Sequence, residues 1–190
     1  MIRIARPGNL GLGLAAGIVL VGLSFTHFLS PAAPGSDQGR APEIRGYRTW
    51  TRVNSEPAMM DAATAAMCAR AVKSENPHQN KFINVFVNVV GKQAMLYQKT
   101  PRFPEGTVIV KEKLPAADSN KPEALTVMLK HAEGYNPEGG DWEYLVMSGD
   151  GAAVISRGRN ESCQRCHTLY KNTDFVTRHY LSAEQIQKLQ

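Results

Sequence analysis

Cysteine is scarce in this chain of 190 residues, and its basic residues are not gathered into stripes. Three cysteines are too few for the disulfide framework of a small secreted scaffold. The net charge of +5 is small, and no stretch interleaves Lys or Arg with aromatic residues, so no nucleic-acid partner is expected. With 43% hydrophobic and 21% charged residues, the composition is that of a globular protein, and the length favours a single domain.

The N-terminus has the pattern of a membrane-targeting segment. Arg3 and Arg6 precede an almost uninterrupted apolar run from Leu10 to Leu29. A basic flank followed by such a run is typical of a signal peptide, and this run is also long enough to span a bilayer. We therefore expect residues 1–32 to be a signal peptide or a membrane anchor helix, with a buried core helix as the remaining alternative.

Everything after this run is expected to lie beyond the inner membrane. Small residues at Ser30-Pro31-Ala32 suit a cleavage site, so the exported protein is expected to be periplasmic, either soluble or tethered by its N-terminal helix. Residues 33–45 begin with a stretch rich in Pro, Ala, Gly and Ser, which is typical of a flexible linker. Residues 46–190 are expected to form the folded domain.

Four runs of β-branched, aromatic and other apolar residues in this domain are typical of strands. Clusters of Pro, Gly, Asn and Asp between the runs are typical of turns. The predicted strands are residues 81–88, 107–114, 124–130 and 142–147. Their spacing favours antiparallel pairing over parallel β-α-β units. The expected fold class is therefore α+β, a mainly antiparallel sheet with peripheral helices, preceded by the hydrophobic N-terminal helix.

Helices are predicted at three places around the sheet. Ser55-Glu56-Pro57 is a helix start signal, and the Ala- and Met-rich run 58–72 is expected to continue it, with Cys68 packed as a small apolar residue. A helical segment is expected after the two C-terminal cysteines, and Ser182 is expected to begin a last short helix.

The residues with the clearest chemistry are Cys163-Gln164-Arg165-Cys166-His167. Cys-x-x-Cys-His is the attachment motif of c-type haem. Two thiols one helical turn apart can form thioether bonds to the two vinyl groups on one porphyrin edge, and the next residue can place its imidazole on the iron. Export agrees with this interpretation, because c-type haem is attached beyond the inner membrane.

Three other interpretations of these cysteines remain open. A thioredoxin-type redox pair would follow a strand within a β-α-β unit, which this sequence does not predict. A zinc site could use Cys163, Cys166 and His179, but no further histidine follows to supply a fourth ligand. A disulfide between Cys163 and Cys166 would close a loop too small to stabilise the fold much.

The position of the motif narrows the kind of haem protein. No methionine follows His167, which disfavours the usual electron-transfer cytochrome with a downstream Met ligand. Helical-bundle cytochromes carry the motif near the C-terminus, but residues 81–148 are predicted to be mainly strands. A late motif on a β-rich domain, without an evident sixth ligand, indicates an open iron coordination position that binds small molecules.

Five segments together resemble the cytochrome P460 family and its relative, the β-type cytochrome c′. They are Tyr47-Arg48-Thr49-Trp50, Ile83 to Asn88, Phe103 to Lys113, Gly140 to Tyr144, and Cys163 to Tyr180. The resemblance covers roughly residues 45–181. It implies a mainly antiparallel sheet, a homodimer, one covalently attached haem c, and a five-coordinate iron with His167 as its proximal ligand.

The resemblance also implies a role for one lysine. P460-type members carry an extra covalent bond from a lysine side chain to the porphyrin rim, and the matching residue is Lys111. In an extended strand, Lys111 shares a face with Lys113, while the more apolar set with Val108, Val110 and Glu112 shares the other. Alternation alone therefore favours Lys111 in solvent, whereas the resemblance favours Lys111 beside the haem.

A distal carboxylate would accept protons during hydroxylamine oxidation. Glu161, two residues before Cys163, is the nearest candidate in sequence, and a solvated loop acid is the alternative interpretation. The predicted catalytic residues are therefore Lys111 and Glu161. The predicted cofactor-binding residues are Cys163, Cys166, His167 and Lys111, with His167 as the iron ligand.

Two functions of different classes follow from the resemblance. The first is an enzyme that oxidises hydroxylamine at the iron, through an iron nitrosyl, and passes electrons to an unidentified acceptor. The second is a binding protein that takes nitric oxide in an apolar pocket, as β-type cytochrome c′ does, without turnover. Simple electron transfer comes third, because it gains nothing from an open iron coordination position.

Overall fold

The computed structural model describes residues 41–60 and 80–189. These residues fall within one compact unit, which spans residues 37–190. The predicted signal peptide or anchor, residues 1–32, lies outside the described residues, as does most of the predicted helix 58–72. Among the described residues, no helix combines the length and the apolar character that crossing a bilayer requires.

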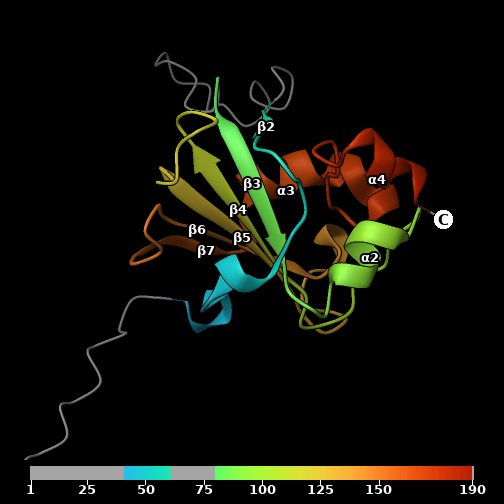
Figure 1. Cartoon of the computed structure of the whole chain (residues 1–190). Coiled ribbons are helices and arrows are strands. Elements are labelled where there is room, and N and C mark those ends of the chain that lie inside the picture. Colours follow the sequence, from blue (N-terminus) through green and yellow to red (C-terminus); the bar gives the residue numbers. More distant parts are fainter. Residues whose placement is uncertain (1–40, 61–79, 190) are drawn as a thin grey trace, which may run out of the picture. The chain divides into compact units, whose positions relative to one another are not determined.

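A seven-stranded sheet forms the centre of the domain (Figure 1). Its strand order is β1-β3-β4-β5-β6-β7, and β2 also pairs with β3. Every pairing is antiparallel. The strands are β1 (Thr51–Arg52), β2 (Ala58–Met59), β3 (Phe82–Val87), β4 (Val108–Leu114), β5 (Ala124–Lys130), β6 (Trp142–Ser148) and β7 (Val154–Gly158).

Short helices surround the sheet, so the expected α+β fold class is confirmed. The helices are η1 (Pro42–Ile44), η2 (Tyr47–Thr49), α2 (Lys92–Tyr97), η3 (Pro137–Gly139), α3 (Glu161–His167), η4 (Thr168–Thr173) and α4 (Ala183–Gln187), where η marks a 3-10 helix. In Figure 1, α2, α3 and α4 lie together on one side of the sheet, and η1 and η2 lie apart from them.

One face of the sheet packs against these α-helices. Ile109, Met128 and Tyr144 are cross-strand partners on β4, β5 and β6, and they belong to one buried apolar cluster. Met95 of α2 is buried in the same cluster, and Cys163 of α3 packs against it. We call this side of the sheet the α3 face.

The opposite face holds a second apolar cluster. Val110, Val127 and Leu145 are the neighbouring cross-strand partners on the same three strands, and their side chains alternate with those of the α3 face. Ala41 and Ile44, around η1, are buried against them, so we call this side the η1 face. Strands covered on both faces are apolar almost throughout, which is why they can be predicted as runs rather than as alternating patterns.

The four predicted strands are confirmed as β3 to β6, each within one residue at either end. The sequence does not predict β7, a short edge strand in which Ile155 is 67% exposed and little apolar surface is buried. It also does not predict α2, which has six residues and no side-chain cap.

The predicted helix 58–72 is wrong for its first residues. Ala58 and Met59 form β2 and pair with Ile83 and Phe82 of β3. Tertiary pairing here outweighs the local start signal at Ser55-Glu56-Pro57, because the free edge of β3 offers backbone hydrogen-bond partners. Residues 61–72 of this predicted helix, with Cys68, lie outside the described residues.

The predicted C-terminal helices are confirmed. The segment after the cysteines continues as η4, and α4 begins after Ser182. The Ser182 side chain accepts a hydrogen bond from Gln185 N, and the Gln185 side chain accepts one from Ser182 N, which is a capping box. Gln185 also donates to the Val53 carbonyl at 2.7 Å, so the chain's last helix is anchored beside β1.

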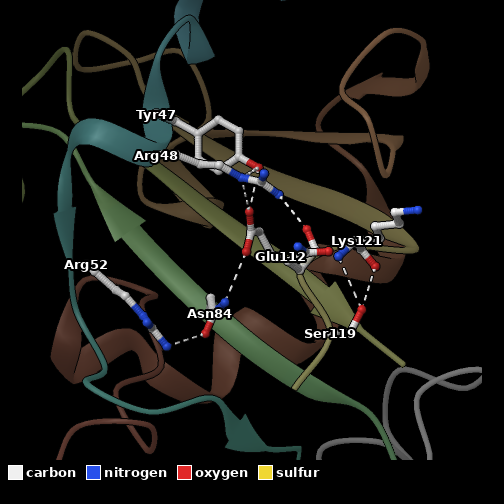
Figure 2. Close-up of polar contacts among 8 residues, drawn as sticks. Tyr47, Arg48, Arg52, Asn84, Glu112, Ser119 and Lys121 are labelled. Carbon is white, nitrogen blue, oxygen red and sulfur yellow. Dashed lines mark hydrogen bonds and ion pairs between the residues drawn. The ribbon is translucent and has the colours of Figure 1, made fainter. Parts of the chain in front are cut away.

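A buried carboxylate fastens the first part of the domain to the sheet (Figure 2). The Glu112 side chain is 4% exposed, and its Oε1 accepts hydrogen bonds from Tyr47 OH at 2.7 Å and Arg48 Nε at 2.8 Å. Its Oε2 accepts one from Asn84 Nδ2 at 3.1 Å, and Asn84 Oδ1 accepts one from Arg52. Burial, together with the hydrogen bond to Glu112, raises the pKa of Tyr47 to about 12, so this hydroxyl keeps its proton. Glu112 thus ties η2 to β3 and β4.

Replacing Glu112 with Gln should lower the free energy of unfolding by about 2 kcal/mol, because Arg48 loses its charged acceptor and a buried amide N–H then faces other donors. The urea midpoint of the purified protein measures this change. Glu123→Gln is the matched control: its side chain is 35% exposed beside Lys81 and Lys113, so it should cost less than about 1 kcal/mol. Equal losses in the two variants would contradict the role of burial.

Candidate functional site

Helix α3 carries both cysteines and the histidine of the Cys-x-x-Cys-His motif. The helix begins after Asn160, whose Oδ1 accepts a hydrogen bond from Ser162 N at 3.2 Å. Such a cap satisfies a backbone N–H that the first turn leaves without a partner. Cys163 and Cys166 are separated by one turn and lie on the same side of the helix. Cys166 is 7% exposed, and Cys163 is half-buried against the α3-face cluster.

The imidazole of His167 is oriented by one backbone carbonyl. Its Nδ1 lies 2.7 Å from the Phe175 oxygen. A carbonyl only accepts hydrogen bonds, so the proton of the neutral ring is on Nδ1, and Nε2 carries the free lone pair. This is the arrangement of metal-ligating histidines, whose second nitrogen donates to a carbonyl or carboxylate.

The His167 ring is held neutral by its surroundings. Burial lowers its pKa to about 4, against the opposing effect of the Phe175 hydrogen bond, and the charge of Lys111 lowers the pKa further. The ring also contacts Tyr144, with the ring centroids 5.2 Å apart and the planes tilted by 50°. A neutral imidazole with a free Nε2 is the form that binds iron.

Lys111 lies on the α3 face, the same side as His167. It is two residues from Ile109, whose side chain belongs to the α3-face cluster, and it pairs with Val85 on β3 and Thr126 on β5. Its charge acts on the His167 ring, and its side chain is half-buried. Lys111 is therefore partly covered, and not fully in solvent as alternation alone favours, because both faces of β4 carry apolar clusters.

The next lysine on that face has different neighbours. Lys113 Nζ lies 3.7 Å from Glu123, whose other carboxylate oxygen accepts a hydrogen bond from Lys81 at 2.6 Å. Within residues 41–60 and 80–189, no carboxylate lies within ion-pairing distance of Lys111. Glu112, between the two lysines, points to the η1 face, as strand alternation requires.

Glu161, the predicted proton acceptor, is the first residue of α3 and is exposed to solvent. It is not among the groups that shift the pKa of His167, whereas Lys111 is. The structure therefore places Lys111 and His167 on the same side of the sheet and Glu161 at the exposed start of α3.

Two features of the site are missed by sequence reasoning. The Tyr144 hydroxyl is buried and has no hydrogen-bond partner among the described residues, and burial raises its pKa far above the ordinary value, with Cys163 and Asp174 adding to the effect. Tyr144 lies in the Gly140 to Tyr144 segment, so its position in that motif was the available signal. Phe175 acts through its backbone carbonyl, for which side-chain chemistry offers no signal.

The described residues do not support a zinc site. His179 contacts the Tyr170 ring, with centroids 5.3 Å apart. In the part of the chain that the structure describes, no three His, Cys, Asp or Glu side chains are grouped so as to hold a metal ion.

A cavity of about 390 Å³ lies at another part of the sheet, where β4 begins and β5 ends. It is lined by Glu43, Glu105, Gly106, Thr107, Val108, Leu129, Lys130, His131 and Arg157. None of these residues belongs to the Cys-x-x-Cys-His motif, so this cavity is separate from the candidate site.

The residues on the α3 face fit a c-type haem. Cys163 and Cys166 would hold the porphyrin edge, and His167 has its Nε2 free to ligate iron. Lys111 and the unpartnered hydroxyl of Tyr144 add two polar groups near that ligand in an otherwise apolar cluster. Buried polar atoms without partners in a protein chain are typical of sites that a bound group completes.

The comparisons with known proteins agree with this fit. The family model described as cytochrome P460 matches residues 44–178, which include every strand of the sheet and all of α3. A search of curated proteins found no match. Because the family model covers most of the chain and the motif residues fit the cofactor, this protein belongs to the cytochrome P460 family of c-type haem cytochromes.

Proposed function

We propose that this protein oxidises hydroxylamine at a haem c and passes the electrons to a separate acceptor. The observation that carries the proposal is the position of Lys111, half-buried on the α3 face and close enough to His167 for its charge to act on that ring. In P460-type members a lysine in this place is bonded to the porphyrin rim, and the nitric oxide binders lack that bond.

Bound haem would supply a redox-active iron with an open coordination position for the substrate nitrogen. The chain's own residues hold and orient it. Cys163 and Cys166 of α3 would hold the porphyrin through their thiols, and His167 would ligate the iron through Nε2, in the tautomer that the Phe175 carbonyl selects. The apolar cluster beside them would keep water from the bound ring.

Lys111 is proposed to bond to the porphyrin rim: the new bond from its amine nitrogen to a rim carbon replaces one N–H and one C–H bond, the two protons go to solvent, and the two electrons pass through the iron to the external acceptor. Its amine has no carboxylate partner among the described residues, in contrast to Lys113, which is held beside Glu123. An amine that is not engaged in an ion pair on the cofactor side of the sheet is free to approach the ring. A third point of covalent attachment would distort the macrocycle and change its electronics, which is one way a protein tunes haem chemistry.

Hydroxylamine releases protons as its electrons are removed, so a proton acceptor is needed. Glu161 stays a prediction for this role. Its carboxylate is exposed at the start of α3, where it is in contact with water.

The apolar character of the α3 face favours a second candidate function, binding of nitric oxide without turnover. Ile83, Val85 and Met128 are buried in the cluster on the side of the sheet that carries Lys111. A neutral diatomic ligand needs no proton acceptor and is compatible with such a lining. The two functions therefore differ in whether Lys111 is linked to the cofactor and in whether hydroxylamine is consumed.

Export to the periplasm and assembly as a homodimer belong to the same proposal. The basic and apolar N-terminal pattern supports export, which haem attachment requires. The dimer rests on the family resemblance.

Lys111→Arg tests the proposed function directly. In wild-type holoprotein matured with haem, we expect a tryptic peptide that joins Lys111 to Cys163–His167, a red-shifted main band in the ferrous spectrum, and hydroxylamine oxidation with an artificial acceptor. The variant should keep its thioether-bound haem and lose the cross-linked peptide, the red shift and turnover, because an arginine does not form the bond.

Lys113→Arg is the matched control, since it changes the next lysine on the same strand face and keeps the charge beside Glu123. It should retain the link, the spectrum and turnover. Full hydroxylamine oxidation by Lys111→Arg would contradict the role of Lys111. A wild-type holoprotein without link or turnover that binds nitric oxide would favour the second candidate.

Haem attachment is expected to depend on the two thiols of α3. Cys163→Ala and Cys166→Ala should each leave one thioether bond. Because Lys111 is proposed to form a third bond to the porphyrin, the double variant is made in the Lys111→Arg chain, where it should release its haem into acidified organic solvent. Intact-mass spectrometry of the polypeptide distinguishes these states. Cys68→Ala, outside the motif, should keep wild-type attachment. Release of haem from the wild-type protein would show that neither thiol is bonded to it.

A further inference from the structure

The Phe175 carbonyl that orients His167 belongs to a turn with an unusual backbone. Asp174 and Phe175 have φ values of 52° and 64°, in the left-handed region that residues with a side chain rarely adopt. Two such residues in succession cost energy and persist only where the surroundings hold them. The direction of the Phe175 carbonyl, and so of the His167 ring, depends on what holds this turn.

The Asp174 carboxylate anchors the turn to the sheet. Its side chain is 7% exposed, and its oxygens accept hydrogen bonds from Lys130 Nζ at 2.9 and 2.8 Å. It also accepts one from Phe103 N at 2.8 Å. Lys130, the last residue of β5, donates in addition to the Gly140 carbonyl at 2.8 Å. One lysine therefore joins the turn, β5 and the loop before β6.

The backbone of the same residue is held by a tryptophan. Trp142 Nε1 donates to the Asp174 carbonyl at 2.8 Å, and Trp142 is fully buried at the start of β6. Its ring packs edge-on against Phe103, with centroids 5.5 Å apart, and Lys130 Nζ lies 5.0 Å from its centre. The Asp174 side chain and main chain thus have separate, buried anchors.

The backbone of Gly140, in the loop before β6, packs closely against Asp174 and Phe175 of the turn. Gly140 has a φ of 65°, and a Cβ atom there would overlap the Phe175 ring and lie 3.2 Å from Asp174 Oδ1. The loop before β6 can therefore pack directly on the turn only without a side chain at this position.

We propose that Asp174, held by Lys130 and Trp142, is a positioning residue that sets the orientation and basicity of the haem ligand His167. By fixing the Phe175 carbonyl 2.7 Å from His167 Nδ1, it maintains the hydrogen bond that gives the imidazole partial anionic character. A more basic imidazole binds ferric iron more strongly and lowers the reduction potential. The inference rests on the haem ligation that the proposed function requires, and it does not depend on hydroxylamine turnover.

Asp174→Asn in the holoprotein is the first test. Asparagine also tolerates the left-handed region, so the variant removes the charge and keeps the backbone preference. We expect the iron–histidine stretching band of the ferrous protein, measured by resonance Raman spectroscopy, to move to lower frequency. The reduction potential should rise. A purely structural role for the Asp174–Lys130 pair would lower the urea midpoint and leave the stretching band unmoved.

Trp142→Phe is the second test. It tests the proposed role of the Asp174 anchor even if Asp174→Asn does not take up haem. It removes the N–H that holds the Asp174 carbonyl, together with part of a buried ring, and changes no charge, so a shift of the band cannot come from a lost charge near the iron. Trp50→Phe is the matched control, because Trp50 packs on the η1 face. It should leave the band and the potential at their wild-type values.

Two results would overturn the proposal. The first is a wild-type stretching band and potential in haem-loaded Trp142→Phe. The second is an equal shift in Trp50→Phe, which would show that the effect is not specific to the Asp174 anchor. A wild-type protein that binds haem and does not oxidise hydroxylamine would overturn the proposed function and leave this test intact.

Discussion

The hydrogen bond between His167 Nδ1 and the Phe175 carbonyl is the contact on which the site depends. It joins α3, which carries both cysteines, to a turn that is itself bound to β5 and β6 through Lys130 and Trp142. Residues far apart in the chain therefore meet at one imidazole nitrogen. Since that nitrogen carries the proton, the other is left with a free lone pair, so in the proposed site a backbone oxygen would determine which nitrogen ligates the iron.

The candidate haem site and the hydrogen bonds that hold η2 to the sheet lie on opposite faces of the sheet. On β4, Lys111 lies on the α3 face, the side of the sheet that carries His167, while Glu112 lies on the opposite face and binds Tyr47 and Arg48. Both polar groups lie on a strand whose other residues are largely apolar and buried, and each is placed by the simple alternation of an extended backbone. The same strand thus serves the site on one side and stability on the other.

The parts of the fold that can be predicted from the sequence are those that depend on local sequence alone. Apolar runs between turn residues predict β3 to β6, and Cys163 to His167 are recognised from their spacing alone. The side on which Lys111 lies is not decided by alternation, because neither face of β4 is in solvent. The turn at Asp174 is beyond local reasoning, since its left-handed backbone is imposed by contacts with Trp142 and Lys130. Pairing with the edge of β3 likewise overrides the helix signal before Ala58.

The opposite orientation of two adjacent side chains on β4 has a consequence for how such a protein diversifies. Under the proposed function, a substitution at position 111 would change the surroundings of the cofactor without touching the carboxylate that secures the beginning of the domain. If Lys111 has the proposed role, a single codon can exchange one reactivity for the other while folding is preserved, whereas an inserted residue in this strand would reverse both sides at once.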